Sequence, residues 1–423
     1  MVSWKNLLQG GAGRPAPVVA LEIGTTKVVA LVGEMREDGH IVIAGIGEHP
    51  ASGVRKGEVI DLDNAQVCVQ SALSGAEGTG HVGIHQVHLT LSGGHIQTLV
   101  NRGTIPVIDP QQGVTEDDVR QVTDVARAVN LTGDRRILHS IGQGYLVDGE
   151  RVGRPEGFDA ATLSLDMLIL HTRASHIRNT VKLVRNLSVD VADVAFSGLC
   201  SGLAVLTPEQ KEGGVLVIDL GGGVTDYAAY AANMFAAAGA IAVGGDHVTN
   251  DILLAFNIPR GEAERLKLDS GCAVRTEAGR GERITLPTEG SYHPGSTVSV
   301  EGLQTVINLR MAELFRTIRS RVDREGIYHL LGAGVVLTGG GALLRGAREL
   351  AEEVFRLPCA IGRPVGVSAP DAVLESPVYA APVGLIKYAF KNPVSQGRSG
   401  RIGERLRYLL GGGDGGEDAE TEA

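Results

Sequence analysis

The sequence predicts an α/β protein with two related lobes. An apolar strand, an acidic residue and a glycine turn occur in the same order within 18–32 and again within 215–230. A third glycine run, within 335–355, also follows an apolar strand and precedes an amphipathic helix. A chain of 423 residues is too long for one hydrophobic core, and matched units in both halves are typical of duplicated domains. We therefore expect two α/β lobes that face each other.

The first glycine turn lies in VVALEIGTTKVVALV, where continuous apolar runs on both sides are typical of buried strands. Glu22 precedes the turn, which contains Gly24, Thr25 and Thr26 and ends at Lys27. Successive backbone N–H groups in such a turn form a concave site for anions, and the lysine adds positive charge. The turn therefore predicts a phosphate-binding loop.

The second turn lies in VLVIDLGGGVTDYAAY, with three glycines between Asp219 and Asp226. Glycine lets phosphate oxygens reach the backbone N–H groups because no side chain intervenes. Carboxylates cannot contact phosphate directly, so we expect them to hold water around a Mg²⁺ ion that bridges the phosphates. Either turn alone would be an ordinary hairpin in which glycine supplies a positive φ. The matched pair favours the phosphates of a nucleotide.

The third glycine run is VVLTGGGALLRGARELAEEVF, with Gly339, Gly340 and Gly341 after a short apolar strand. Bare glycine backbone at the start of a helix can lie beneath a purine or approach a phosphate. Connections of a strand to a helix through glycine occur in many α/β folds, so this run is informative only in combination with the two turns. Together the three elements predict one nucleotide site between the lobes.

In this order the three elements resemble the ATPase signature of the actin, Hsp70 and sugar-kinase superfamily, with EIGTTK and IDLGGGVTD at the phosphates and LTGGGALLRG at the adenosine. Within that superfamily the chain is similar to the FtsA family of bacterial cell-division proteins. The similarity is carried by ALEIGTTKVVALVGE, VHLTLSGGHI, AFSGLCSGLAVLT, IDLGGGVTDYAAY and GGDHVTNDILLAFNIPRGEAERLKLDSGCA. It runs in order through residues 18–391.

The resemblance implies a two-lobed actin-like ATPase fold with duplicated RNase H-like domains, and ATP with Mg²⁺ as the ligand. It implies two catalytic acids, Asp219, which would hold Mg²⁺ through water, and Asp226. Glu22 stands where many relatives have Asp, so we expect slow ATP hydrolysis at most. Without the resemblance, the pair Glu264 and Lys267 would be a surface ion pair; with it, they contact ribose and base. The implied nucleotide contacts are Gly24, Thr25, Thr26, Lys27, Gly221, Gly222, Gly223, Val224, Thr225, Gly245, Glu264, Lys267, Gly339, Gly340 and Gly341.

The resemblance also divides the chain into lobes. The first lobe, called 1A in the family, is expected at 16–86 and 172–204. The second lobe, 2A, is expected at 205–258 and 325–391. Each lobe should carry one inserted subdomain.

The insertion at 87–171 is similar to the SHS2-like α+β subdomain 1C, which implies self-association into an actin-like filament and contact with later divisome proteins. An accessory domain without a partner is the alternative. Thr115 and Asp118 have the spacing of a capping box at a helix start. The insertion at 259–324 is similar to subdomain 2B, which implies binding of the C-terminal peptide of the tubulin-like division protein FtsZ. We expect Arg310 to contact that peptide.

The C-terminal part predicts a membrane-binding helix. Residues 392–400 form a polar linker, and RIGERLRYLL at 401–410 places its apolar residues on one helical face with arginines around them. Such a helix lies in a membrane interface and is attracted by anionic lipid; docking on the protein body is the alternative. Acidic residues 411–423 are expected to be disordered. The expected membrane contacts are Ile402, Arg405, Leu406, Leu409 and Leu410.

Composition limits the remaining functions. A formal net charge of −10 argues against nucleic acid as a partner, and four widely spaced cysteines indicate reduced thiols. We expect a peripheral protein on the inner face of the cytoplasmic membrane, at the division septum. It would bind ATP, polymerise, tether FtsZ and help to assemble the Z-ring and divisome. The alternatives are a sugar-kinase-type phosphotransferase, an Hsp70-type chaperone and an actin-like protein of pilus assembly.

Overall fold

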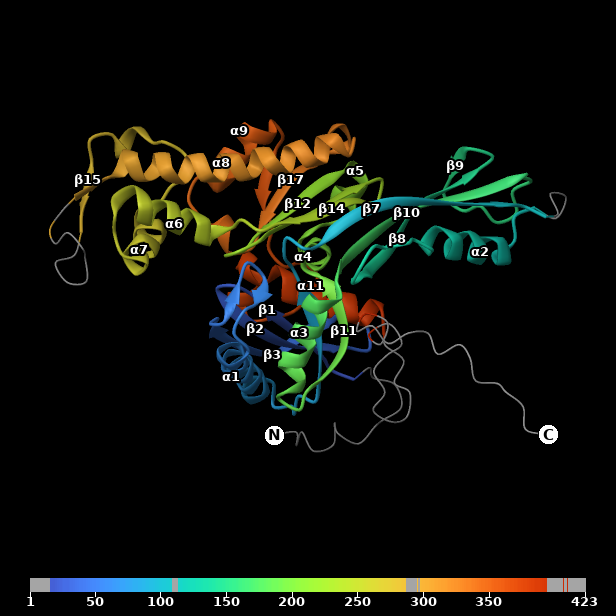
Figure 1. The fold of residues 1–423 in the computed structure, drawn as a ribbon, viewed down its shortest axis with the longest axis horizontal. Helices are drawn as coiled ribbons and strands as arrows, with labels where there is room; N and C mark the ends of the chain where they lie inside the picture. The colour runs from blue at the N-terminus through green and yellow to red at the C-terminus, as the bar shows by residue number, and fades with distance from the viewer. Residues whose placement is uncertain are drawn as a thin grey trace.

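Residues 16–108, 113–286, 295, 297–393, 406 and 409 are described in the computed structural model of the chain. Figure 1 shows one lobe below and one above, with a subdomain extending to each side of the upper lobe. The chain enters the lower lobe first and returns to it twice, as the green and red helices beneath the upper lobe show (Figure 1). Each lobe contains one five-stranded sheet.

The first lobe is built on a sheet of order β11-β6-β1-β2-β3. Helix α1 packs against β2 and β3, and α11 packs against β1 and β2. The approach of α1 is close: a Cβ on Gly47 would lie 1.9 Å from the Ala72 carbonyl oxygen. The elements are β1 (Val18–Ile23), β2 (Lys27–Met35), β3 (Ile41–Pro50), β4 (Val54–Arg55), β5 (Glu58–Val59), α1 (Leu62–Gly80), β6 (Gln86–Leu91), α3 (Ala174–Arg185), β11 (Asp190–Phe196), α4 (Ser197–Val205) and α11 (Ala380–Lys391).

The second lobe is built on a sheet of order β14-β13-β12-β17-β18. Its central strands are buried along nearly their whole length, which explains their continuous apolar sequence. The elements are α5 (Pro208–Gly213), β12 (Val215–Leu220), β13 (Thr225–Ala231), β14 (Met234–Ile241), α6 (Gly245–Phe256), η3 (Tyr328–Leu330), β17 (Gly334–Thr338), η4 (Gly340–Leu343), α9 (Ala347–Phe355), β18 (Cys359–Ile361), α10 (Asp371–Leu374) and η5 (Pro377–Tyr379).

The two sheets have the same connectivity. In each, the first three strands form an antiparallel meander, β1-β2-β3 or β12-β13-β14. Two further strands then join in parallel beside the first one, β6 and β11 or β17 and β18. The duplication expected from the two glycine turns is therefore present in the fold.

The insertion in the first lobe is a sheet of order β7-β10-β8-β9 covered by helix α2, with its own hydrophobic core. Its elements are β7 (Gln97–Pro106), α2 (Glu116–Arg127), β8 (Arg135–Val147), β9 (Glu150–Val152) and β10 (Thr162–Arg173). Helix α2 begins with the expected capping box between Thr115 and Asp118. The structure differs at the boundary expected at residue 87, because β6 pairs with β1 and β11 in the lobe sheet. The insertion begins after that strand.

The insertion in the second lobe lies at the opposite end of the molecule (Figure 1). It contains α7 (Arg260–Ser270), η2 (Glu277–Gly279), the two-stranded sheet of β15 (Arg283–Thr285) and β16 (Thr297–Ser299), and the long helix α8 (Val300–Arg324). One apolar face of α8, which includes Leu303, Ile307 and Ile318, is buried and belongs to the core of the second lobe.

The two lobes share a core through α4 and α11. Helix α4 packs against α11 and against β12 and β13 of the second lobe. Helix α11, although it follows the second lobe in sequence, packs on the sheet of the first lobe. In the part of the chain that the structure describes, no helix is both long enough and apolar enough to cross a bilayer. The four cysteines are all buried free thiols, as expected.

Candidate functional site

The two glycine turns meet between the lobes. Each is closed by one backbone hydrogen bond, from Gly24 N–H to the Lys27 carbonyl and from Gly221 N–H to the Val224 carbonyl, both 3.0 Å. A Cβ on Gly222 would lie 2.0 Å from Thr26 Oγ1, and a Cβ on Gly223 would lie 2.5 Å from Thr25 Oγ1. A side chain at either position would force the first turn to shift, because Thr25 and Thr26 occupy that space.

A cavity of about 540 Å³ opens beside the turns. Its wall combines the first turn, the second turn, the third glycine run and helix α7, which come from both lobes and from the second insertion. Of the residues expected to contact a nucleotide, those that line it are Gly24, Thr25, Thr26, Lys27, Gly221, Gly222, Gly223, Val224, Gly245, Glu264, Lys267, Gly339, Gly340 and Gly341.

Thr225 differs from this expectation. It is fully buried and does not line the cavity. Its hydroxyl donates to the Val243 carbonyl at 2.8 Å, which fastens the end of the second turn to the start of α6. The reason is strand alternation: Thr225 begins β13, and neighbouring residues of a strand point to opposite faces. The next residue, Asp226, is the one that lines the cavity.

Three carboxyl groups gather in the cavity wall: Glu22, Asp219 and Asp226. Burial, with the charge of Asp219 nearby, raises the pKa of Glu22 to about 8, against a smaller opposing effect of Lys27. Burial raises the pKa of Asp219 to about 6, although Ser201 donates a hydrogen bond to it. Burial and the other two carboxyl groups raise the pKa of Asp226 well above its usual range.

Among the described residues, these three carboxyl groups do not bring their oxygens close enough together to share one ion directly, so a cation here would be held through water. Asp226 Oδ1 is buried and has no hydrogen-bond partner among the described residues, and a buried unpaired acceptor carries a free-energy cost. Oxygen donors of this kind suit Mg²⁺, which retains several waters and binds through few carboxylates. Asp219 lines the same cavity, and its expected role in holding the water shell of such an ion stays a prediction. Glu22 and Asp226 are its neighbours there.

Lys27 is held in place by two residues of the first lobe and the C-terminal region. Its Nζ lies 3.0 Å from Glu48 Oε2 and 4.3 Å from the centre of the Tyr379 ring, and the Tyr379 hydroxyl donates to the same carboxylate. Burial opposes ionisation of Glu48, but the hydrogen bonds from Lys27 and Tyr379 lower its pKa. An ammonium has three donors, so Lys27 can keep this pair and still donate to an anion in the cavity.

Glu264 and Lys267 form a network rather than an isolated surface pair. Lys267 Nζ lies 2.8 Å from Glu264 Oε2, 2.9 Å from Thr249 Oγ1 and 3.2 Å from the Gly245 carbonyl. Thr249 also donates to Glu264. The network joins α7 to the first turns of α6 at the cavity wall.

The third glycine run differs in detail from the expected strand, turn and helix. Gly339 has φ +78°, and a Cβ there would lie 2.2 Å from Asp219 Oδ1. Gly340 and Gly341 begin the short 3-10 turn η4, and α9 starts only at Ala347. Gly340 faces open space, since the nearest atom to its Cβ position is 4.0 Å away. This patch of bare backbone remains available to a flat ring.

Sequence reasoning missed two residues of the site. Ser201, from α4, donates to Asp219, and the N–H of Gly57 donates to Thr25 Oγ1 at 3.2 Å. Ser201 lies in AFSGLCSGLAVLT, one of the segments that carry the family resemblance, but no spacing rule connects it to Asp219. Gly57 had no signal beyond being a glycine in a turn.

Comparison with known proteins decides the family. A family model described as Cell division protein FtsA matches residues 216–384, and one described as SHS2 domain inserted in FTSA matches residues 93–171. The chain is 36% identical to Cell division protein FtsA of Pseudomonas aeruginosa over 375 residues, which is 88% of this chain and 89% of that protein. The chain belongs to the FtsA family.

FtsA of Escherichia coli K12 is 35% identical over 379 residues, or 88% of this chain and 90% of that protein. Among solved structures, the PilM-PilN type IV pilus biogenesis complex matches with TM-score 0.61 at 14% identity, covering 88% of this chain and 98% of that one. MreB5 of Spiroplasma citri bound to ADP matches with TM-score 0.52 at 16% identity, covering 90% and 99%. The actin-like fold and the FtsA resemblance expected from the sequence are both confirmed.

Within the FtsA framework, Arg310 lies on α8 of the second insertion and is already paired. Its Nε and Nη2 donate to the two carboxylate oxygens of Asp251 at 2.5 and 3.0 Å, and its Nη1 donates to Glu313 at 2.7 Å. A peptide carboxylate at this position has to compete with Asp251. Three leucines of the neighbouring region are exposed: Leu254 on α6, Leu268 on α7 and Leu309 on α8.

Two expected membrane contacts fall on described residues. Leu406 and Leu409 are fully buried and belong to the hydrophobic core that includes the first lobe. In this structure these two leucines pack on the body, which is the alternative placement for the tail. Ile402, Arg405 and Leu410 lie outside the described residues, as do the expected linker after residue 393 and the acidic tail 411–423.

Proposed function

We propose that this FtsA-family chain is an ATP-binding, actin-like adaptor of cell division. The observation that carries the proposal is the contact between the two glycine turns beside one cavity of about 540 Å³. Phosphates would accept hydrogen bonds from the backbone of both turns, with Lys27 supplying charge. Ribose would lie near Glu264 and Lys267, and the adenine on the bare backbone around Gly340. An ADP-bound solved structure of the same fold, MreB5, supports a nucleotide in the cleft.

Mg²⁺ is the proposed second ligand, held through water by Asp219. The ion would neutralise phosphate charge, and it would favour the ionised form of Asp219 against the burial that raises its pKa. We infer slow hydrolysis at most, since Glu22 adds a methylene where relatives of the superfamily have Asp. The nucleotide would act mainly by closing the lobes, a population shift that depends on its differential affinity for the two states.

Membrane binding is proposed for residues 401–410. One short amphipathic helix binds lipid weakly, and several copies on a filament bind firmly; the first insertion, subdomain 1C, is the proposed filament contact and the site for later divisome proteins. Since Leu406 and Leu409 are buried on the body, lipid has to compete with that docked state. Filament formation at an anionic surface would favour the lipid-bound state. The proposed location is the inner face of the cytoplasmic membrane at the division septum.

FtsZ is the proposed partner of the second insertion, subdomain 2B. Its C-terminal peptide combines acidic residues with apolar anchors, and Arg310 with the adjacent exposed Leu309 of α8 offers complementary chemistry. Binding there would tether FtsZ filaments to the membrane and support Z-ring assembly. The sugar-kinase alternative has no observation in its favour. The pilus-assembly alternative has fold similarity at 14% identity, compared with 36% identity to an FtsA protein.

Co-sedimentation with anionic liposomes tests the adaptor. Full-length protein and a version ending at Lys391 are compared with and without ATP and FtsZ. We expect ATP-promoted pelleting of the full-length protein, co-pelleting of FtsZ, and loss of both in the shortened protein. Pelleting that does not depend on the tail would overturn the membrane proposal. Liposome-bound protein that leaves FtsZ in the supernatant would overturn the tethering proposal.

A further inference from the structure

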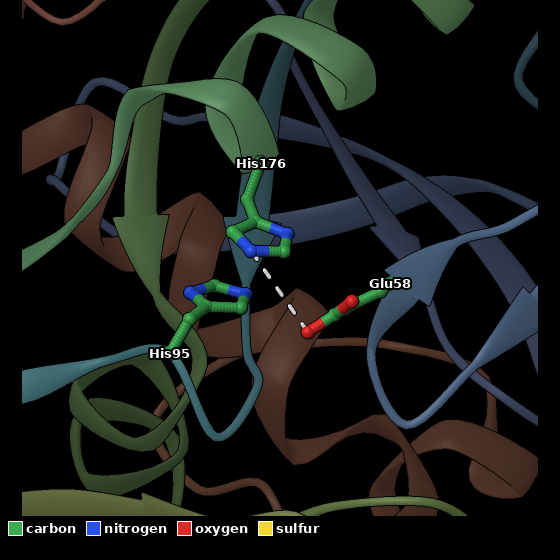
Figure 2. A group of neighbouring side chains, drawn as sticks. All are labelled: Glu58, His95 and His176. Carbon is green, nitrogen blue, oxygen red and sulfur yellow. Dashed lines mark ion pairs between the residues drawn. The ribbon is translucent and has the colours of Figure 1, made fainter. Parts of the chain in front are cut away.

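A second cluster of chemically active side chains lies at the base of subdomain 1C. Glu58 is on β5 of the first lobe, His95 is on the connection from β6 into 1C, and His176 is in the first turn of α3, directly after β10 leaves 1C. Figure 2 shows the three side chains converging from separate segments. The cluster therefore lies where the first lobe meets both chain connections to the insertion.

The geometry places three ligand-type atoms within reach of one ion. One nitrogen or oxygen from each residue lies within 4.8 Å of the others, and His176 Nε2 lies 3.9 Å from Glu58 Oε1. The imidazole rings of His95 and His176 stack at 3.9 Å between centroids with 10° between their planes. Ligand atoms around a tetrahedral zinc ion are roughly 3.4 Å apart. Turning one ring out of the stack and shifting by about an ångström would close the site.

His95 supplies the second observation. Its Nδ1 lies 2.6 Å from Thr172 Oγ1, within hydrogen-bond distance, and Thr172 is fully buried, so the orientation of the ring is fixed. Its Nε2 is buried and has no hydrogen-bond partner among the described residues, in a residue that is only 8% exposed. An unpaired buried ring nitrogen is costly, whereas a metal ligand held through its other nitrogen is the usual arrangement for histidine.

The surroundings also define what else would bind. A cavity of about 530 Å³ opens over the cluster and is lined by Arg55, Lys56 and Arg173 in addition to the three residues. These cations disfavour a bare metal ion, but they favour an anion bound to it. A divalent metal with one carboxylate and two neutral histidines keeps a net positive charge and an open coordination position. A carboxylate or phosphate in that position would meet the basic wall.

We propose that Glu58, His95 and His176 form a zinc site whose fourth position takes an anionic ligand from the basic cavity. The site would join the first lobe to both connections of 1C. It also adjoins the glycine-turn cavity: Gly57, next to Glu58, contacts Thr25, and Thr180, which lines that cavity, donates to the His176 carbonyl. Zinc would therefore stiffen the base of the insertion next to the phosphate-binding turns.

Calorimetric titration of chelator-treated full-length protein with Zn²⁺ tests the site. We expect one ion per chain, and affinity at least ~10-fold weaker in Glu58→Gln and His176→Asn. Both residues are partly exposed, so these variants should fold. The matched control is His329→Asn, an exposed histidine of η3 outside the cluster. Its affinity should equal that of the wild type.

Co²⁺ spectra and thermal unfolding give two further readouts. Bound Co²⁺ should show the visible bands of a four-coordinate nitrogen and oxygen site without a sulfur charge-transfer band, which excludes the four cysteines. Zn²⁺ should raise the unfolding temperature of the wild type and of His329→Asn but not of the two cluster variants. Stoichiometric zinc binding that survives both cluster variants, or no binding by the wild type, would overturn the proposal.

Discussion

The carboxyl groups of the glycine-turn cavity make stability depend on pH. The folded pKa of Glu22, about 8, is above the unfolded value of 4.5 because the carboxyl group is buried and faces Asp219. The folded state therefore holds the proton more tightly than the unfolded state. The stabilising contribution is complete below pH 4.5 and is lost as the pH rises through 8.

The magnitude follows from the two pKa values. Each pH unit between them changes the free energy of unfolding by about 1.4 kcal/mol, so the contribution of Glu22 falls by roughly 3 kcal/mol between pH 5 and pH 8. Water in the cavity reduces this figure, because Glu22 is partly exposed there. The variant Glu22→Gln removes the titrating group and keeps the shape. Its stability should therefore exceed that of the wild type increasingly as the pH rises.

Urea unfolding of the ligand-free protein at pH 5, 6, 7 and 8 measures this difference. Urea is uncharged and leaves electrostatic effects unscreened. The control is Glu34→Gln, which is on β2 but outside the cavity wall. Its free energy of unfolding should change with pH in the same way as that of the wild type. If the free energies of unfolding of the wild type and Glu22→Gln differ by a constant amount across this range, the Glu22 carboxyl group is not desolvated in the cavity.

Further predictions concern binding, folding and the tail. Gly222→Ala places a Cβ 2.0 Å from Thr26 Oγ1, so the ATP affinity measured by fluorescence titration should fall at least ~10-fold. A tenfold loss corresponds to about 1.4 kcal/mol of binding free energy. Unchanged affinity would contradict the contact between the turns. In Gly340→Ala the new Cβ meets no atom nearer than 4.0 Å, so the unfolding temperature of the ligand-free protein should equal that of the wild type while the ATP affinity falls. An ATP affinity equal to that of the wild type would show that the adenine does not lie on Gly340. Asp166→Asn weakens the paired contacts to Arg102 at 2.6 and 2.9 Å and should lower the unfolding temperature of the protein. An unchanged unfolding temperature would show that this ion pair, whose arginine side chain is exposed, does not stabilise subdomain 1C. Leu406→Glu should abolish liposome pelleting; retained pelleting would contradict the tail's role.

The sequence predicted the parts of the fold that depend on local patterns. The two glycine turns, their flanking buried strands and the capping box at Thr115 are all visible in short segments, and each is present in the structure. The duplication followed from the likeness of the two turns. The family resemblance predicted that the two turns meet. The structure adds the close approach of Gly222 and Gly223 to the threonines of the first turn.

Features set by distant contacts could not be predicted. A strand such as β6 has the same apolar pattern whether it joins the lobe sheet or the insertion, so the boundary at residue 87 was set too early. The docking of α11 on the first lobe requires the chain to come back from the second lobe, and no local pattern in the sequence of α11 indicates this. The pairing of Arg310 with Asp251, and the convergence of Glu58, His95 and His176, join residues far apart in sequence with no common motif. Thr225 was assigned to the site because a motif names residues without showing which strand face they occupy.

The central claim is that both glycine turns bind one triphosphate through their backbone. Diffraction from crystals grown with Mg²⁺ and a non-hydrolysable ATP analogue tests it most directly. We expect phosphate oxygens within hydrogen-bond distance of N–H groups in both the Gly24 turn and the Gly221 turn, with the water shell of the metal at Asp219. A nucleotide bound at only one turn, or outside the cavity between the lobes, would contradict it.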